Sequence, residues 1–264
     1  MLQLNHVSKL FNPGSPDEKT ALVNVNLILK PGDFVTVIGS NGAGKSTLMN
    51  MISGVLKPDS GEIRIEDNEI SHLPEYKRSR WIGRVFQDPM AGTAPHMTIE
   101  ENLAMAYARG KRRGLAFGVT SARRNWFREQ LSRLGIGLED RLKAKVGTLS
   151  GGERQALSLL MATFTEPQIL LLDEHTAALD PARAELVTQL TQSIVEELKL
   201  TTLMVTHNME QAIRLGNRLI MMDGGRIILD VDEDTKSVLT TERLLGEFER
   251  ISGHKLADDR VVLG

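Results

Sequence analysis

The chain has 264 residues, enough for one large domain or two small ones with a sizeable hydrophobic core. Its formal net charge of −2 and ordinary composition argue against broad nucleic-acid binding, so we expect no nucleic-acid partner. Cysteine is absent, which excludes disulfides and cysteine-based metal or redox chemistry and suits a reducing compartment. No purely apolar run approaches the roughly 20 residues that cross a bilayer, so any membrane role is expected to need a partner.

The first third of the chain alternates between strand-like runs and turns. Apolar and polar residues alternate in the earliest runs, which indicates antiparallel strands with one solvated face. A helix is predicted over 45–53 and is ended by Gly54. The predicted strands cover residues 2–8, 23–29, 34–38, 63–65 and 82–86.

Helical patterns then dominate, before strands return near residue 169. We predict helices over 98–109, 121–135, 151–164, 181–198 and 208–215, and strands over 169–172, 202–205, 219–222 and 227–229. The 181–198 helix begins with Asp180 as cap and Pro181 at its first position. Its apolar face is predicted to carry Val187, Leu190, Ile194 and Leu198.

These elements predict an α/β fold with a mixed, largely parallel core sheet, an N-terminal antiparallel β part and a helical insert. The catalytic α/β core is expected over 1–89 and 166–230, the helical subdomain over 90–165, and a C-terminal tail over 231–264. Residues 109–145 hold eleven Lys or Arg against three acidic residues. This basic segment is either a solvated helix surface or a docking face for an anionic or membrane-proximal partner.

A phosphate-binding loop of the G-x-x-x-x-G-K-[ST] type follows the buried strand at 34–38. Its glycines let backbone N–H groups point at an anion on a positive helix N-terminus. We expect Lys45 to reach the terminal phosphates and the Ser46 hydroxyl to ligate Mg²⁺. The loop reads Gly39-Ser40-Asn41-Gly42-Ala43-Gly44-Lys45-Ser46-Thr47.

Two further segments carry chemistry. In Leu149-Ser150-Gly151-Gly152-Glu153, the serine and glutamate have the spacing of a capping box. The two glycines just inside the helix weaken it, but they leave a bare, positive helix end that a partner chain's triphosphate could approach. The strand at 169–172 runs into Asp173 and Glu174, at the strand end where open α/β sheets bind ligands. Asp173 suits Mg²⁺, and Glu174 could deprotonate an attacking water.

Together these segments resemble the ATP-binding cassette (ABC) ATPases, over about residues 2 to 230. The Leu149–Glu153 motif is the most specific element, because other P-loop classes lack it. The resemblance implies a P-loop cassette that binds ATP with Mg²⁺ and hydrolyses it. It also implies an ATP-dependent, head-to-tail homodimer in which Ser150, Gly151 and Gly152 contact the γ-phosphate held by the partner subunit.

The resemblance assigns roles to four more positions. Gln87 matches a glutamine that senses Mg²⁺ and links the insert to the membrane subunit, and His207 matches the switch histidine that supports Glu174. Asp180 matches an aspartate that communicates across the dimer. Phe11 falls where the family places an aromatic ring under adenine, although a packing role is an open alternative. His175 departs from the proline that the family usually has there, which predicts a local change in the stiffness of this loop.

The arrangement of the chain resembles bacterial importer cassettes that serve branched-chain-amino-acid-type permeases. The resemblance implies separate permease chains, an extracytoplasmic binding protein, and a cytoplasmic location against the inner face of the plasma membrane. Amino acids or related small molecules are the expected solutes. The alternatives are an exporter or lipid-type cassette and a soluble ABC assembly ATPase. Gln87 with Met90–Met97 is the expected permease-binding surface, unless that loop is buried under the insert.

Overall fold

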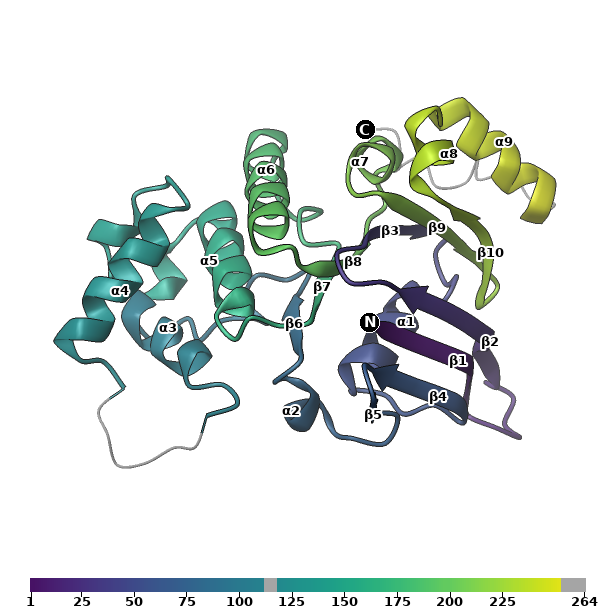
Figure 1. Ribbon diagram of the computed structural model, residues 1–264, viewed down its shortest axis with the longest axis horizontal. Coiled ribbons are helices and arrows are strands. Elements are labelled where there is room, and N and C mark those ends of the chain that lie inside the picture. The colour runs from purple at the N-terminus through teal and green to yellow at the C-terminus, as the bar shows by residue number, and fades with distance from the viewer. Residues whose placement is uncertain (112–117, 253–264) are drawn as a thin grey trace. The chain divides into compact units, whose positions relative to one another are not determined.

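A computed structural model describes residues 1–111 and 118–252 of the chain (Figure 1). Part of the basic segment, 112–117, and the end of the tail, 253–264, lie outside the described residues. Contacts within the chain form two compact units, residues 1–78 with those from Leu200 onward, and residues 79–199. The expected functional subdivision at 90–165 stays a prediction.

The first unit contains an antiparallel sheet with strand order β2-β1-β4-β5. In β1, Leu2, Leu4 and Val7 are buried and separated by more exposed residues, as the alternation in the sequence predicted. The strands are β1 (Leu2–Phe11), β2 (Lys19–Leu29), β4 (Ser60–Ile65) and β5 (Asn68–Glu69).

A second sheet in this unit places β3 between two parallel neighbours, β8 and β9, and β10 pairs antiparallel with β9. Five of the six residues of β3 are buried, which explains its unbroken apolar sequence. Its elements are β3 (Phe34–Gly39), β8 (Thr201–Val205), β9 (Arg218–Asp223) and β10 (Arg226–Val231). The unit also contains α1 (Lys45–Ser53), α2 (Glu75–Arg78) and α7 (Met209–Arg214).

Two C-terminal helices were not predicted from the sequence: α8 (Glu233–Ser237) and α9 (Thr241–Ser252). Leu244 and Phe248 of α9 are buried in a cluster with Ile38, Leu219 and Met221. This pair has the i, i+4 spacing of an amphipathic helix, but the surrounding charges obscured the pattern. The described part of the expected tail is therefore folded onto the β3–β9–β10 sheet.

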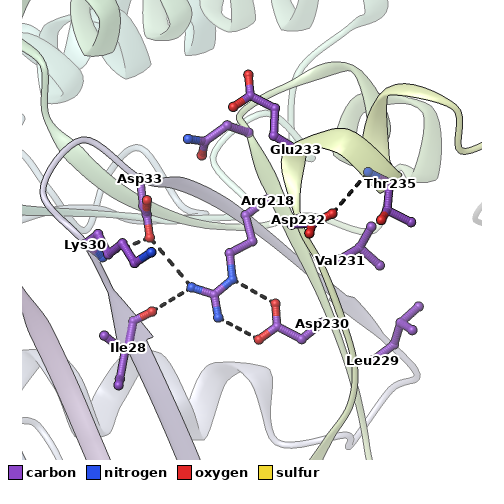
Figure 2. Close-up of a pocket in the computed structure, with 11 residues that line it drawn as sticks. Ile28, Lys30, Asp33, Arg218, Leu229, Asp230, Val231, Asp232, Glu233 and Thr235 are labelled. Carbon is purple, nitrogen blue, oxygen red and sulfur yellow. Dashed lines mark hydrogen bonds and ion pairs between the residues drawn. The ribbon is translucent and has the colours of Figure 1, made fainter.

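Arg218 ties the start of β9 to β10 and β2 (Figure 2). Its guanidinium binds both carboxylate oxygens of Asp230, at 2.7 and 2.6 Å, and donates to the carbonyl oxygen of Ile28 at 2.6 Å. Asp33 lies 3.6 Å from the same group. Bonding to Asp230 raises the pKa of Arg218, so Arg218 remains a fixed cation in the wall of the pocket that Figure 2 shows.

The second unit combines a parallel strand pair with helices. The strands are β6 (Ile82–Val85) and β7 (Ile169–Asp173), with Ile82 opposite Ile169. A Cβ at Gly83 would lie 2.6 Å from the carbonyl oxygen of Ala162, so glycine allows the helix that contains Ala162, α5, to pack closely on β6. The helices are α3 (Ile99–Tyr107), α4 (Ser121–Ser132), α5 (Gly151–Thr163) and α6 (Pro181–Leu198), with 3₁₀ turns η1 (Leu138–Asp140) and η2 (Val146–Thr148).

The face that α6 buries overlaps the predicted one, because Leu190 and Ile194 pack against the helical core cluster as expected. Val187 is buried as expected, but Leu198 is 39% exposed, and Thr188, Thr191 and Val195 complete the buried stripe. The threonine hydroxyls bond carbonyls one turn back, so these polar residues are satisfied inside the core. Among the described residues, no helix is long and apolar enough to cross a membrane.

Candidate functional site

The predicted phosphate loop lies between β3 and α1, as the motif requires. Gly39, Gly42 and Gly44 have positive φ angles of 151°, 81° and 102°. A Cβ at Gly39 would lie 2.1 Å from the carbonyl oxygen of Met222, and one at Gly44 would lie 2.6 Å from that of Ala21. Conformation and space therefore both demand glycine at these two positions.

The helix after this loop begins without a side-chain cap, because Gly44 occupies the N-cap position. An uncapped helix start with positive partial charge is suited to an anion. Lys45 is 5% exposed, and its Nζ donates to the carbonyls of Gly39 at 2.7 Å and Ser40 at 3.0 Å. The ammonium is thus held against the loop that would surround a phosphate, while the side chain of Ser46 is exposed.

Two supports of this loop were not anticipated from the sequence. Asp223, at the end of β9, accepts a hydrogen bond from the Ser40 hydroxyl at 2.8 Å, and Gly225 donates to the carbonyl of Ala43 at 3.1 Å. The turn between β9 and β10 therefore braces the phosphate loop. The position of the acidic Asp223 at the end of a predicted strand was the feature of the sequence that could have indicated this support.

The fully buried Arg78 supports the other end of α1. Its Nη1 donates to the carbonyls of Met51 at 2.6 Å and Ile52 at 2.9 Å. Its remaining nitrogens donate to the backbone carbonyls of Ser71 and Leu73, each at 2.8 Å. The side chain thus satisfies carbonyls in the last turn of α1, which have no partner within the helix. Burial lowers the pKa of Arg78 to about 10.

In the second unit, Asp173 ends the buried strand β7 and Glu174 follows it. Both carboxylates are partly buried. Glu174 has a φ of 47°, in the left-handed region that is strained for a residue with a Cβ. Asp173 is paired with Arg84 of β6, whose Nη2 lies 2.8 Å from Oδ2. No local pattern in the sequence indicates this ion pair.

His175, the departure from the family pattern, is only 1% exposed. Thr191 donates to the carbonyl of Val187 at 2.8 Å, so His175 Nε2 donates to the Thr191 hydroxyl at 2.9 Å. Nδ1 has no hydrogen-bond partner among the described residues. Burial lowers the pKa of His175 to about 4, so the ring stays neutral near pH 7. Its hydrogen bond to Thr191 anchors the loop after Glu174 to α6.

The capping box at the start of α5 is confirmed. The backbone N–H of Ser150 donates to Glu153 Oε2 at 2.7 Å, and the backbone N–H of Glu153 donates to Ser150 Oγ at 3.3 Å. Arg141 binds the other carboxylate oxygen of Glu153 at 2.6 Å. Burial alone would raise the pKa of Glu153, but the bonds from Ser150 and Arg141 outweigh it and lower the pKa.

The two glycines of this motif also have a packing role. A Cβ at Gly151 would lie 3.1 Å from a methyl group of Leu179, and one at Gly152 would lie 3.2 Å from Cβ of Arg183. Larger residues would therefore push the start of α6 away from α5. Close packing and access for an anion are two separate reasons for glycine here.

Gln87 is exposed just beyond β6, and Gln155 of α5 donates to the carbonyl of the preceding Phe86 at 2.9 Å. In the following loop Met90 is 40% exposed, whereas Met97 is only partly exposed. Asn102 orders the loop by accepting from the amide of Ala94 at 2.7 Å and donating to its carbonyl at 3.1 Å. This segment is therefore neither a free loop nor a fully buried one.

The other predicted residues occupy the ends of elements. His207 follows β8 and is partly exposed, and Phe11 ends β1 with Lys9 Nζ 5.7 Å from its ring centroid. Asp180 caps α6, as predicted, by accepting from the amide of Arg183 at 3.1 Å. The pocket of Figure 2, about 580 Å³, contains none of the predicted site residues in its lining.

Comparison with known proteins identifies the family. A family model described as "ABC transporter" matches residues 22–177. The chain is 45% identical over 249 residues to the tyrosine transport ATP-binding protein of Clostridioides difficile, covering 94% of this chain and 99% of that protein. It is 34% identical over 229 residues to the energy-coupling factor transporter ATP-binding protein EcfA2 of Halalkalibacterium halodurans, covering 84% and 77%.

A solved structure of an ATP-binding cassette also matches this chain. The ATP-binding cassette MJ0796, in a dimeric post-hydrolysis state bound to ADP and Pi, matches with a TM-score of 0.75 and 32% identity, over 88% of this chain and 99% of that one. The α/β P-loop fold predicted from the sequence is thereby confirmed. The chain belongs to the ABC transporter family and is an ATP-hydrolysing, ATP-binding cassette subunit of an ABC transporter.

Proposed function

We propose that this chain powers a bacterial importer for an amino acid, with aromatic amino acids as the favoured solutes. The observation that carries this proposal is the 45% identity with a tyrosine transport ATP-binding protein, which extends over 94% of this chain and nearly all of that relative. In this proposal two copies associate head to tail on ATP and drive separate permease chains. An extracytoplasmic binding protein delivers the solute, and the cassette stays at the inner face of the plasma membrane.

The proposed nucleotide roles are supported by features within each unit. The loop Gly39–Thr47 surrounds the phosphates, with Lys45 supplying the charge, and Phe11 stacks on adenine. Ser150, Gly151 and Gly152 serve the γ-phosphate of the partner subunit's nucleotide. Asp180 transmits contact across the dimer. The supporting features are the glycine-shaped loop, the buried Lys45 and the two glycines that begin α5.

Each residue proposed for Mg²⁺ carries an oxygen atom, and oxygen is the donor that Mg²⁺ takes from protein groups and substrate phosphates. Ser46 offers an exposed hydroxyl, Asp173 a carboxylate and Gln87 an exposed amide. The bound ion would neutralise developing charge on the phosphate oxygens. Glu174 accepts the proton of the attacking water, and His207 keeps the switch role that the resemblance to the family implies.

Glu174→Gln tests the catalytic assignment, because it keeps the shape of the side chain but removes the base. ATP hydrolysis should fall about 10²–10⁴-fold while binding of a fluorescent ATP analogue persists. With hydrolysis blocked, ATP should shift the chain to a dimer in gel filtration. Near-normal hydrolysis would refute the role of Glu174, and a monomer in saturating ATP would refute the dimer.

The arrangement across the dimer predicts complementation. Lys45→Ala should lose ATP binding, and Ser150→Arg should bind ATP without hydrolysing it. A mixture of the two can form one site that carries neither substitution, so some activity should return. Equal loss of binding in both variants would refute the assignment of Ser150 to the partner's nucleotide.

Uptake tests the transport assignment. A strain lacking this gene should lose uptake of labelled tyrosine, and the wild-type chain, but not Glu174→Gln, should restore it. Met90→Glu should uncouple uptake while the isolated subunit keeps its ATPase activity, if Gln87 and Met90–Met97 bind the permease. Efflux that depends on this chain would favour the exporter alternative. Unchanged uptake of all amino acids would refute the proposed solute class.

A further inference from the structure

The parallel pairing of β6 and β7 places the guanidinium of Arg84 against Asp173, the carboxylate that we assign to Mg²⁺ binding. Arg84 lies opposite Leu171 in the register, and Asp173 lies two residues further along the same face of β7. The side chains meet diagonally, with Arg84 Nη2 2.8 Å from Asp173 Oδ2. They are only 11% and 15% exposed, so solvent screens the pair weakly.

Arg84 is held in place by more than this contact. Its guanidinium lies 4.7 Å from the ring centroid of Phe86, the residue that follows β6. No described hydrogen bond reaches its Nε. The side chain is thus fixed between an aromatic ring and Asp173.

From this geometry we propose that Arg84 sets the affinity of the site for its divalent cation. The inference rests on the proposed function, because it takes Asp173 as a ligand of Mg²⁺. The guanidinium neutralises one of the two carboxylates at the end of β7 and competes for Oδ2. A divalent cation is therefore held weakly by the protein alone and strongly only together with nucleotide phosphates. The same charge favours release of the cation with ADP after hydrolysis.

Removal of Arg84 has two opposing effects on metal binding, and their sizes decide the sign. Asp173 has only two side-chain torsions on a rigid strand end, so the loss of an orienting partner is small. A full positive charge in contact with the ligand carboxylate, in a weakly screened site, is the larger effect. We therefore expect metal binding to become tighter when the charge is removed.

The experiment titrates Mn²⁺ into the purified full-length chain with ADP and follows free Mn²⁺ by EPR. Arg84→Met should bind Mn²⁺ about tenfold more tightly than the wild type, on the scale of changes seen when groups around a ligand carboxylate are altered. Arg84→Lys, which keeps the charge, should stay within about twofold of the wild type. Unchanged or weaker binding in Arg84→Met would overturn the proposal.

Two further measurements separate this role from a structural one. In chelator, Arg84→Met should melt at a lower temperature because Asp173 has lost its partner, yet Mn²⁺ should raise its melting temperature more than that of the wild type. Arg84 acting only in folding would lower the melting temperature without changing the Mn²⁺ response. Arg84→Gln, which keeps a hydrogen-bond donor without charge, serves if Arg84→Met does not fold, and it should also tighten binding.

A control identifies failure of the underlying function. Fluorescent ADP should bind the wild type and all Arg84 variants with equal affinity in EDTA, since the phosphate loop is unchanged. If the wild type does not bind ADP, the assignment of the nucleotide site is wrong. If ADP binds but Arg84→Met does not tighten Mn²⁺ binding, only the role of Arg84 is wrong.

Discussion

Replacing Arg78 by methionine tests how the helix after the phosphate loop is held in place. Methionine is of similar length and fills the space, but it donates no hydrogen bond. The change removes the donors to Met51 and Ile52, in the last turn of α1, and to Ser71 and Leu73. No solvent can take their place, because Arg78 is completely buried.

The expected loss follows from two opposing contributions. Four hydrogen bonds from a charged donor contribute about 1.5–3 kcal/mol each, or roughly 6–12 kcal/mol in total. Against this, burial lowers the pKa of Arg78 from 12.5 to about 10, so burial costs the charged form about 3 kcal/mol. Methionine avoids that cost and packs well. The net decrease in the free energy of unfolding should therefore be about 3–9 kcal/mol, a large share of the stability of a typical domain.

Urea unfolding followed by circular dichroism measures this loss, and Arg64→Met is the matched control. Arg64 is 35% exposed and lies 3.9 Å from Glu62, so its replacement should cost less than about 1 kcal/mol. Because α1 carries Lys45, Arg78→Met should also weaken binding of fluorescent ADP under native conditions. A loss below about 1 kcal/mol in Arg78→Met would refute the view that this guanidinium supports α1.

Three further predictions concern the loop and helix termini. Lowering the pH from 6.5 to 4 should reduce the free energy of unfolding by up to about 3 kcal/mol, because His175 is protonated near pH 6.5 in the unfolded chain and only near pH 4 in the folded chain. Urea titrations at several pH values measure this dependence, and His175→Gln should flatten it. Ser150→Ala should lower the stability measured in thermal unfolding by about 1 kcal/mol, because α5 loses its N-cap, and Ser150→Thr should recover most of this loss. Equal stability of Ser150→Ala and the wild type would contradict the role of the cap. Asn102→Ala should speed hydrogen exchange at the amide of Ala94, and unchanged exchange would show that other contacts order the loop.

Much of this molecule could be predicted from local sequence patterns. The loop Gly39–Thr47 was predicted between a strand and a helix, and it lies between β3 and α1. The capping residues Ser150 and Asp180 were identified because a cap acts over three or four residues. Strand and helix types followed from periodicity, which depends only on which side of an element is buried.

Other features depended on residues brought together from distant positions. The Arg84–Asp173 ion pair joins residues 89 positions apart and depends on the register of β6 against β7. In the sequence, Arg84 was only one charge in an apolar strand. Likewise, α9 is stabilised by the surface that β9 and α7 present to Leu244 and Phe248, not by a local signal.

The buried face of α6 shows the same division within one helix. Its start, cap and length followed from the sequence, yet Thr188 and Thr191 are buried while Leu198 is exposed. Hydrophobicity alone ranks leucine as the core residue. A threonine whose hydroxyl bonds a carbonyl of its own helix loses little on burial, and a leucine beyond the edge of the packed surface gains little. The sequence by itself determined that a helix forms here and that Val187, Leu190 and Ile194 face inward. The tertiary structure decided where the buried stripe ends and that two threonines complete it, because burial depends on the shape of the neighbouring surface.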